Sequence, residues 1–288
     1  MMAFIENWLD CPNIDQIQGY SHVIISFAVT YVWEPGKNRC NEQCQVSTPV
    51  PICANGNLQK VREWQQAGTK VLLSFGGAGM GGSWSSSQDD CWEYCYNRGA
   101  ADVARQVAAI VEDQGFDGVD IDFEYFVTRD KAVPFLAQLT TDLQALMPAE
   151  KTVSHAPMDG DVDRGDPYYD VLKQVASSVD YVLPQYYNGP FRPANNLAAV
   201  RPHFTNLVND VFGGDASKVV FGFCNSDCSG TGSNVGSSQA VSIMREVTEW
   251  FPGNGGAYLW AGASDRGNQW SRGVRASLSA ASNMTQGA

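Results

Sequence analysis

Short apolar runs rich in β-branched and aromatic residues recur along the whole chain, and amphipathic stretches separate most of them. Runs of this length and composition predict buried β-strands. Eight strands are expected, near residues 2–8, 22–31, 69–76, 116–125, 151–158, 179–187, 218–224 and 256–262.

The clearest helix is predicted over residues 98–114. Val103, Val107 and Val111 repeat there at helical spacing, and Gly115 follows as a stop signal. Further helices are expected near residues 57–67, 130–146, 237–250 and 268–281.

Strands that alternate with helices indicate parallel βαβ units, and eight such units fit the size of a (β/α)8 barrel. We therefore expect an α/β fold, a TIM barrel that forms a single domain over residues 1–288. A doubly wound open sheet is the alternative. Two long segments, 32–56 and 78–97, each follow a predicted strand. They should lie on the carboxyl-terminal face, where barrel enzymes build their sites.

The chain carries a formal net charge of −12. Nucleic acids and anionic membranes would repel it, because the sequence contains no concentrated basic patch. We expect neither as a partner, and no apolar run approaches the length of about 20 residues that a membrane span needs. No cofactor and no metal are expected, and the protein should act as a monomer.

The chain contains eight cysteines, three pairs of which are spaced C-x-x-x-C. Zinc ribbons use C-x-x-C instead, and only three histidines are available as further ligands. Disulfides are therefore favoured over metal-bound or reduced thiols, which indicates an oxidising compartment and a secreted protein. The pairing stays open, because eight cysteines allow on the order of a hundred combinations.

An acidic row is the strongest chemical signal in the sequence. Side chains alternate faces along a strand, so Asp120, Asp122 and Glu124 should all point into the barrel, with Glu124 nearest its mouth. Neighbours in the row would lie about 7 Å apart. Two full charges at that distance repel by about 2.4 kcal/mol at an effective dielectric constant of 20. The row should therefore hold at least one proton near neutral pH, as a carboxylic acid that donates to a leaving group must.

Two other interpretations of this row are weaker. A buried ion-pair network is possible, but unpaired buried carboxylates cost several kcal/mol each. A divalent-metal site is disfavoured because the spacing lacks the glycine turn of a calcium loop. We expect catalysis.

The run Asp117–Glu124 reads D-G-V-D-I-D-F-E, and it resembles the D-G-x-D-x-D-x-E signature of family 18 glycoside hydrolases. Other stretches resemble family motifs in the same order along the chain. These are Phe4–Trp8 in the first strand, Ser74–Gly77 (S-F-G-G) after the third, Gln185–Asn188 (Q-Y-Y-N) in the sixth and Leu259–Trp260 in the last. The resemblance implies a chitinase that cleaves β-linked N-acetylglucosamine polymers.

The resemblance also implies roles for the catalytic group. Glu124 would protonate the glycosidic oxygen and later activate water, while the 2-acetamido oxygen of the substrate attacks the anomeric carbon with retention of configuration. Asp122 would orient the acetamido N–H. Asp120, hydrogen-bonded to Ser74, would share a proton with Asp122. The hydroxyl of Tyr187 would donate to the acetamido carbonyl.

A second set of residues is expected to bind the sugar or support the site. Trp260 would form an apolar floor under the reacting sugar. Trp84 and Trp92 are candidate platforms for outer sugars, and Asp117 should support the acidic motif structurally. Phe4 stands where many members have tyrosine, so one hydrogen bond to the sugar would be missing. The other expected substrate-binding residues are Gln185, Asn188, Gly76 and Gly77.

Only about 30 residues separate the last two predicted strands. They leave no room for the inserted α+β subdomain of some family members, and the chain is similar to the small plant and fungal type. An open groove and endo-acting cleavage follow. Two alternatives remain: an endo-β-N-acetylglucosaminidase acting on N-glycan cores, and a non-catalytic lectin or inhibitor.

Overall fold

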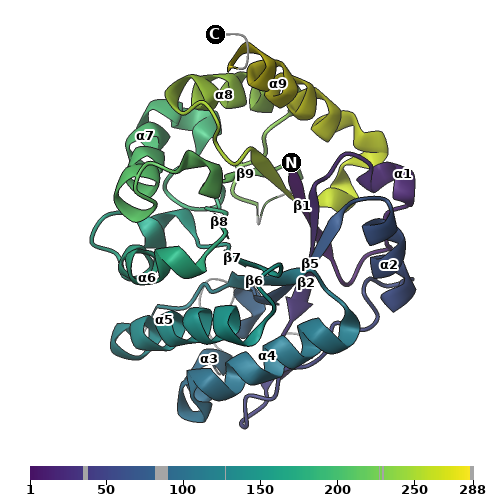
Figure 1. Cartoon of the computed structure of the whole chain (residues 1–288), viewed down its shortest axis with the longest axis vertical. Helices are drawn as coiled ribbons and strands as arrows, with labels where there is room; N and C mark the ends of the chain where they lie inside the picture. The colour runs from purple at the N-terminus through teal and green to yellow at the C-terminus, as the bar shows by residue number, and fades with distance from the viewer. Residues whose placement is uncertain (35–37, 82–89, 127, 227, 229, 286–288) are drawn as a thin grey trace.

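The computed structural model (Figure 1) describes residues 1–34, 38–81, 90–126, 128–226, 228 and 230–285. Its central sheet has eight parallel strands, and each lies within one of the predicted ranges. The strands are β1 Met2–Glu6, β2 His22–Ala28, β5 Lys70–Gly76, β6 Gly118–Asp122, β7 Thr152–His155, β8 Tyr181–Val182, β9 Phe221–Cys224 and β10 Ala257–Trp260.

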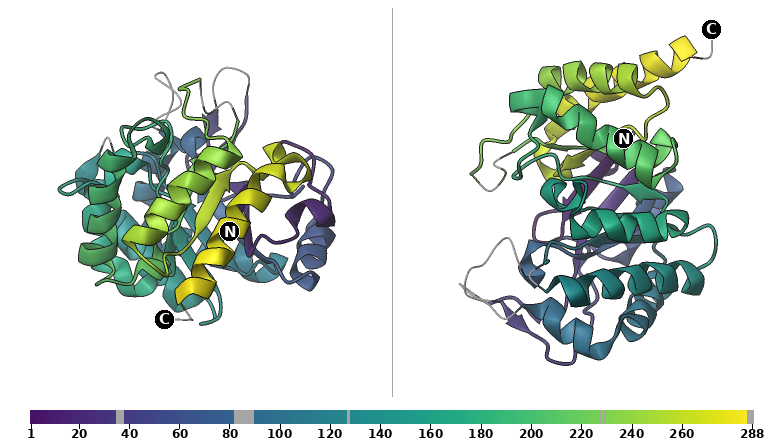
Figure 2. Two further views of the ribbon diagram at one scale, coloured as in Figure 1. Left: turned by 90° about the horizontal axis from the view of Figure 1, so that it is seen from above. Right: turned by 90° about the vertical axis from the view of Figure 1, so that its left-hand side faces the viewer.

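The sheet closes into a barrel. Its strand order is β8-β7-β6-β5-β2-β1-β10-β9, and the two end strands meet through a bridge between Val182 and Val219. The Val220 N–H donates to the Val182 carbonyl at 2.9 Å. Helices surround this barrel on its outside (Figures 1 and 2). The (β/α)8 prediction is confirmed, and the open-sheet alternative is wrong.

The five predicted helices are present, and four others were not predicted. The predicted ones are α2 Leu58–Gln66, α4 Ala100–Gln114, α5 Arg129–Leu146, α8 Ser237–Trp250 and α9 Gln269–Thr285. The others are α1 Ile14–Ile17, α3 Cys91–Arg98, α6 Pro167–Val175 and α7 Pro193–Asn206. The last two begin with proline in the first turn, and α7 is kinked at Asn196 and contains Pro202, which obscures its periodicity.

Shorter elements complete the described chain. A small antiparallel hairpin pairs β3 Tyr31–Val32 with β4 Arg39–Cys40. Single helical turns are η1 Ala78–Met80, η2 Asp159–Val162, η3 Ala176–Ser178, η4 Leu207–Val211, η5 Ala216–Lys218, η6 Gly262–Ser264 and η7 Arg266–Asn268. In the described part of the segment between β9 and β10 there is α8 and no further strand, so no α+β subdomain is inserted there. No helix among the described residues is long and apolar enough to cross a membrane.

Strand alternation divides the core into two shells. On β1, Ala3 and Ile5 belong to the large cluster between the sheet and the helices, whereas Met2 and Phe4 belong to a smaller cluster inside the barrel. The same division holds on β6, where Val119 and Ile121 face the helices. The even-numbered positions of β6 are therefore left to face the barrel interior.

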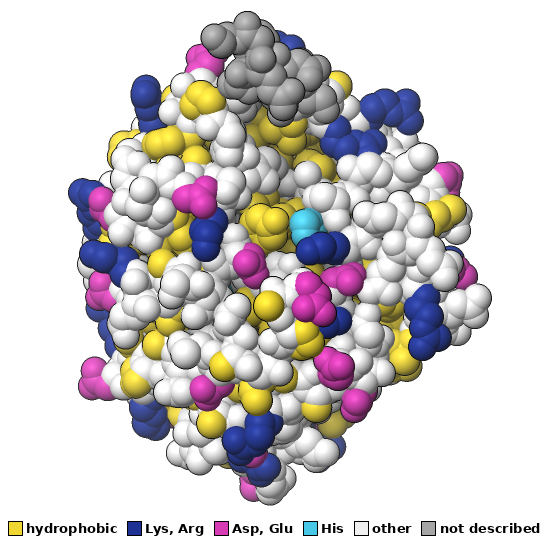
Figure 3. All heavy atoms as spheres, in the orientation of Figure 1, with side chains coloured by type: hydrophobic (Ala, Val, Ile, Leu, Met, Phe, Trp, Pro, Cys, Tyr) yellow, Lys and Arg dark blue, Asp and Glu magenta, His cyan; other side chains and the backbone are white. Residues whose placement is uncertain are grey.

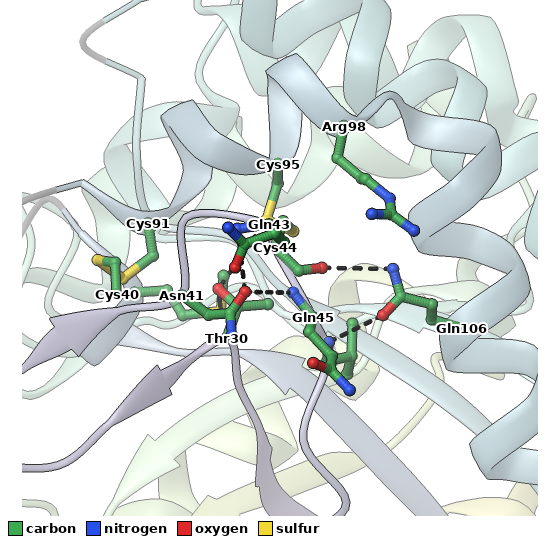
Figure 4. Close-up of a disulfide and its surroundings, with 12 residues drawn as sticks. Thr30, Cys40, Asn41, Gln43, Cys44, Gln45, Cys91, Cys95, Arg98 and Gln106 are labelled. Carbon is green, nitrogen blue, oxygen red and sulfur yellow. Dashed lines mark hydrogen bonds between the residues drawn. A yellow bond between two sulfur atoms is a disulfide. The ribbon is translucent and has the colours of Figure 1, made fainter.

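All eight cysteines are paired, which confirms the disulfide prediction. The bridges are Cys11–Cys53, Cys40–Cys91, Cys44–Cys95 and Cys224–Cys228. Two of them run side by side, because Cys91 and Cys95 are one turn apart on α3 and reach two cysteines of the segment after β2 (Figure 4). Gln106 of α4 adds hydrogen bonds to the Val46 N–H and the Cys44 carbonyl. This long segment is thus fastened to two helices.

The barrel has two unlike ends. The segments that follow the strands gather at one end, on the far side of the molecule in Figure 1. Figure 3 shows the opposite end, where acidic and basic side chains are intermixed and neither sign forms a continuous patch. The carboxyl ends of the strands are therefore the place to look for concentrated chemistry.

Trp92 of α3 is packed into the core. Its ring centroid lies 4.6 Å from that of Phe123, 5.3 Å from that of Phe75 and 6.3 Å from that of Phe135, and its side chain is fully buried. The expectation that Trp92 forms a platform for outer sugars is therefore wrong. Trp84, the other candidate, lies outside the described residues.

We predict that Trp92→Ala lowers the free energy of unfolding by about 3–5 kcal/mol, because it leaves a large cavity. Urea denaturation checks this. Trp33→Ala removes the same side chain where it is 64% exposed, and should cost less than about 0.5 kcal/mol. Equal costs for the two variants would contradict this account of the core.

Candidate active site

Asp120 lies at the centre of the barrel interior and is fully buried. Two hydroxyl groups from the neighbouring strands donate to it: Ser74 of β5 at 2.8 Å to Oδ2, and Ser154 of β7 at 2.7 Å to Oδ1. The hydrogen bond expected between Ser74 and Asp120 is therefore present. The register places the three residues side by side, since β5 pairs with β6 and β6 with β7 at these positions.

Gln185 links the two carboxylates nearer the mouth. Its Nε2 lies 3.1 Å from Asp122 Oδ1 and 3.2 Å from Glu124 Oε1, and 3.0 Å from the carbonyl oxygen of Ala156. Asp122 is buried, whereas Glu124 is partly exposed. An amide from the β8 end of the barrel thus holds Asp122 and Glu124 toward one another from the side.

Burial raises the pKa values of the inner carboxyl groups. It brings the pKa of Asp120 to about 6, against the hydrogen bonds from Ser154 and Ser74, which lower it. The pKa of Asp122 is raised well above its ordinary value, first by burial and then by the negative charges of Glu124 and Asp120. This is the direction expected from the spacing of the row, which retains a proton at a pH where exposed carboxylates have lost theirs.

Tyr187 also faces the interior, as its strand parity with Gln185 predicted. Its ring belongs to the cluster inside the barrel, and its hydroxyl lies 3.2 Å from that of Tyr258. Burial raises the pKa of Tyr187, and the charges of Asp122 and Glu124 add to the effect. The phenol therefore stays neutral and can donate a hydrogen bond.

Trp260, at the end of β10, is partly exposed and belongs to an aromatic strip that sequence reasoning missed. Its ring centroid lies 5.7 Å from that of Phe4 and 6.0 Å from that of Phe27, with an angle of 22° between the Phe27 and Trp260 ring planes. The ring centroid of Phe27 in turn lies 6.5 Å from that of Trp8, whose side chain is 57% exposed. A bulge between Ser26 and Ala28 turns Phe27 toward this strip, and a bulge leaves no local sequence signal.

Gly76 and Gly77 pack closely against neighbouring parts of the protein. Both are buried with positive φ, 124° and 79°, and the Gly77 N–H donates to the Asp122 carbonyl at 2.7 Å. A Cβ on Gly76 would collide with that carbonyl oxygen, and one on Gly77 would meet the Phe27 ring. The two glycines let the end of β5 approach β6 and so support Asp122, and their contact with a substrate stays a prediction.

Asn188 and Asp117 also have structural partners. The Asn188 side-chain oxygen accepts from the Thr231 hydroxyl at 2.6 Å, and its N–H donates to the Ser233 hydroxyl at 2.9 Å. Asn188 thus joins the segment after β8 to the segment after β9, and its contact with a sugar stays a prediction. Asp117 Oδ2 accepts from the Val71 N–H at 2.7 Å, at the amino end of β6. That is structural support.

Two residues beside Glu124 escaped the sequence analysis. The Tyr125 hydroxyl donates to Asp90 Oδ2 at 2.8 Å, which ties the residue after Glu124 to the start of the disulfide-bonded helix α3. Asp161, after β7, has its pKa raised to about 6 by burial and by the charges of Asp166 and Glu124. Neither residue belongs to a periodic pattern. Among the described residues no group of three or more His, Cys, Asp or Glu could hold a metal ion.

The raised pKa of Asp120 predicts a pH-dependent stability. A carboxyl group with a pKa of about 6 in the folded chain and 3.8 in the unfolded chain contributes stability that is lost as the pH rises through that interval. The loss is about 3 kcal/mol. Between pH values of about 3 and about 8, the stability of Asp120→Asn in urea denaturation should therefore fall by about 3 kcal/mol less than that of the wild type. The same pH dependence in both proteins would contradict the assignment.

Known proteins resemble this chain in sequence or in fold. The acidic endochitinase of Nicotiana tabacum is 26% identical over 257 residues, which cover 86% of this chain and 81% of the relative. The crystal structure of a family 18 chitinase from Pseudoalteromonas aurantia matches with a TM-score of 0.77 at 21% identity, covering 96% of this chain and 99% of the other. A fungal endo-β-N-acetylglucosaminidase of family 18 matches with a TM-score of 0.67 at 16% identity, covering 96% and 97%. At such identities the two structures show a shared fold.

The family model described as glycosyl hydrolases family 18 matches residues 1–234. That span runs from the first strand past β9 and includes β6 with its acidic row. Since the match covers well over half of the sequence, the chain is a glycoside hydrolase that belongs to family 18.

Proposed function

We propose that this protein is an endo-acting chitinase that hydrolyses β-1,4-linked N-acetylglucosamine polymers with retention of configuration. The observation that carries the proposal is the contact of Gln185 with both Asp122 and Glu124, inside a barrel that also directs Tyr187 inward. This arrangement provides an acid at the mouth with an orienting carboxylate directly below it.

The first step breaks the glycosidic bond. The acid Glu124 gives its proton to the glycosidic oxygen, and the leaving sugar departs as an alcohol. The acetamido oxygen of the same substrate unit forms the new bond to the anomeric carbon. Asp122 accepts the acetamido N–H and stabilises the positive charge of the resulting ring. Tyr187, kept neutral by burial, donates to the acetamido oxygen and orients it for attack.

The second step restores the enzyme. Glu124, now a carboxylate, takes a proton from water as the water attacks the anomeric carbon and the acetamido group reforms. The substrate has to supply the nucleophile because Asp120 and Asp122 lie on β6, directly before Glu124, and point into the barrel on the same side as Glu124. A retaining enzyme with a protein nucleophile needs a second carboxylate on the opposite side of the sugar, about 5 to 5.5 Å from the acid.

Two features support the endo-acting and extracellular parts of the proposal. The described residues between β9 and β10 form no subdomain that could deepen the cleft. The open groove that results should admit a polymer along its length. Four disulfides suit an oxidising compartment, so we propose that the protein is secreted.

We predict that Glu124→Gln lowers the turnover of a chromogenic chitooligosaccharide by at least about 10²- to 10⁴-fold, because the amide has no proton to transfer. Binding, measured by calorimetry, should persist. Glu150→Gln makes the same substitution at an exposed position and should leave turnover as it is. Activity above about a tenth of the wild-type level in Glu124→Gln would show that another group is the acid.

Because the proposed nucleophile is the acetamido oxygen of the substrate, the enzyme should cleave only polymers that carry this group. A soluble β-1,4-glucan has the same linkage and no acetamido group, so the wild type should leave it intact under conditions in which it degrades soluble chitin. Release of reducing ends checks this. Hydrolysis of both polymers at comparable rates would exclude the substrate-assisted mechanism.

Incubation with colloidal chitin and, separately, with a high-mannose glycoprotein distinguishes the proposed chitinase from the two alternative functions. Products from chitin alone support the chitinase. Release of glycans from the glycoprotein alone would identify an endo-β-N-acetylglucosaminidase, and binding of chitin without products would identify a lectin.

A further inference from the structure

Glu6 is a carboxylate at the mouth of the barrel that the catalytic mechanism does not use. It is the last residue of β1, where Met2 and Phe4 face the interior and Ala3 and Ile5 face the helices. Continued alternation directs Glu6 into the barrel at the carboxyl ends of the strands. Its side chain is partly buried.

Glu6 and Ser26, its neighbour on β2, each have a buried polar atom with no hydrogen-bond partner among the described residues. Glu6 Oε2 is buried and accepts no hydrogen bond from any described residue. In the parallel register Glu6 lies opposite Ser26 of β2, which also faces the interior, and the buried Ser26 hydroxyl is likewise unpartnered among the described residues. Burial raises the pKa of Glu6. Two adjacent buried polar groups without partners are costly, and such groups commonly have a ligand as their missing partner.

This pair lies beside the aromatic strip of Trp260, Phe27 and Trp8. Ser26 directly precedes Phe27, and Trp8 follows Glu6 by two residues. Phe4, two residues before Glu6, contacts Trp260. Aromatic faces of this kind pack against the apolar faces of sugar rings. A sugar unit next to the one on Trp260 would therefore present its polar substituents to Glu6 and Ser26.

The chemistry of the pair favours a cation. A partly desolvated carboxylate gains more from a charged donor than from a hydroxyl, because charge-assisted hydrogen bonds are about twice as strong as neutral ones. No described basic side chain forms an ion pair with Glu6. Asp122, Glu124 and Asp161 at the mouth are also acidic, and the whole chain carries a net charge of −12.

We propose that Glu6, with Ser26, binds the ammonium group of an unacetylated glucosamine unit, so that the preferred substrate is partially deacetylated chitin. The proposal rests on the proposed function in one respect. The reacting unit on Trp260 must keep its acetamido group, because that group is the nucleophile. Glu124, which follows β6, lies at the bond to the leaving sugar, whereas Glu6 lies at the end of β1. Glucosamine would therefore occupy the neighbouring unit on the side away from the leaving group.

The direct test is to sequence the products of partially deacetylated chitin by mass spectrometry. Wild-type products should carry N-acetylglucosamine at the new reducing end and an excess of glucosamine at the next unit. Glu6→Gln, which keeps the shape of the side chain and removes its charge, should lower the ratio of glucosamine to N-acetylglucosamine at that unit by about tenfold. Asp10→Asn removes an equal charge from an exposed position nearby and serves as the control.

Two outcomes would overturn the proposal: an unchanged ratio in Glu6→Gln, or an equal decrease in Asp10→Asn, which would indicate only the overall charge. A second measurement separates it from the proposed function. In the Glu124→Gln background, calorimetry should show that adding Glu6→Gln weakens binding of glucosamine-containing oligosaccharides about tenfold more than binding of fully acetylated ones. This comparison decides the role of Glu6 even if the wild type hydrolyses no chitin, and equal weakening of both would refute it.

Discussion

The burial of carboxyl groups inside the barrel is the constraint on which the rest of the structure depends. Moving a carboxylate out of water costs several kcal/mol unless hydrogen bonds replace the lost hydration. Asp120 receives those bonds from Ser74 and Ser154 on the two neighbouring strands, and Asp122 from Gln185 farther around the barrel. Four strands must therefore be in register before the acidic row is tolerated. The arrangement of strands that closes the barrel is consequently also the one that provides the hydrogen bonds of the candidate active site.

The scaffold around this row limits its movement. Gly76 and Gly77 have no side chain at the point where β5 touches the carbonyl of Asp122, so the strand end that leads to Glu124 is held by direct backbone contact. On the other side, Tyr125 connects the same strand end to Asp90 at the start of α3, and two disulfides fix α3 to the segment after β2. Groups placed this way stay oriented without help from the substrate, which is what a catalytic site requires.

The two sides of the barrel mouth differ in whether their buried polar atoms have hydrogen-bond partners. On the side of β6 and β8, the inner carboxylates have protein partners and raised pKa values, as suits proton transfer. On the side of β1 and β2, Glu6 and Ser26 have buried polar atoms without described partners beside an aromatic strip. We therefore propose that the first side transfers protons and that the second side binds the substrate.

The sequence by itself determined the eight strands, five of the helices and the inward direction of the acidic row, because strand and helix periodicity are local properties of the chain. It could not determine the pairing of the cysteines, the core position of Trp92 or the structural partners of Asn188. Nor did it reveal helix α6, helix α7, which is kinked and contains an internal proline, or the bulge that turns Phe27 toward Trp260. Only the tertiary structure decided these features, because each depends on which distant segments come together once the barrel has closed.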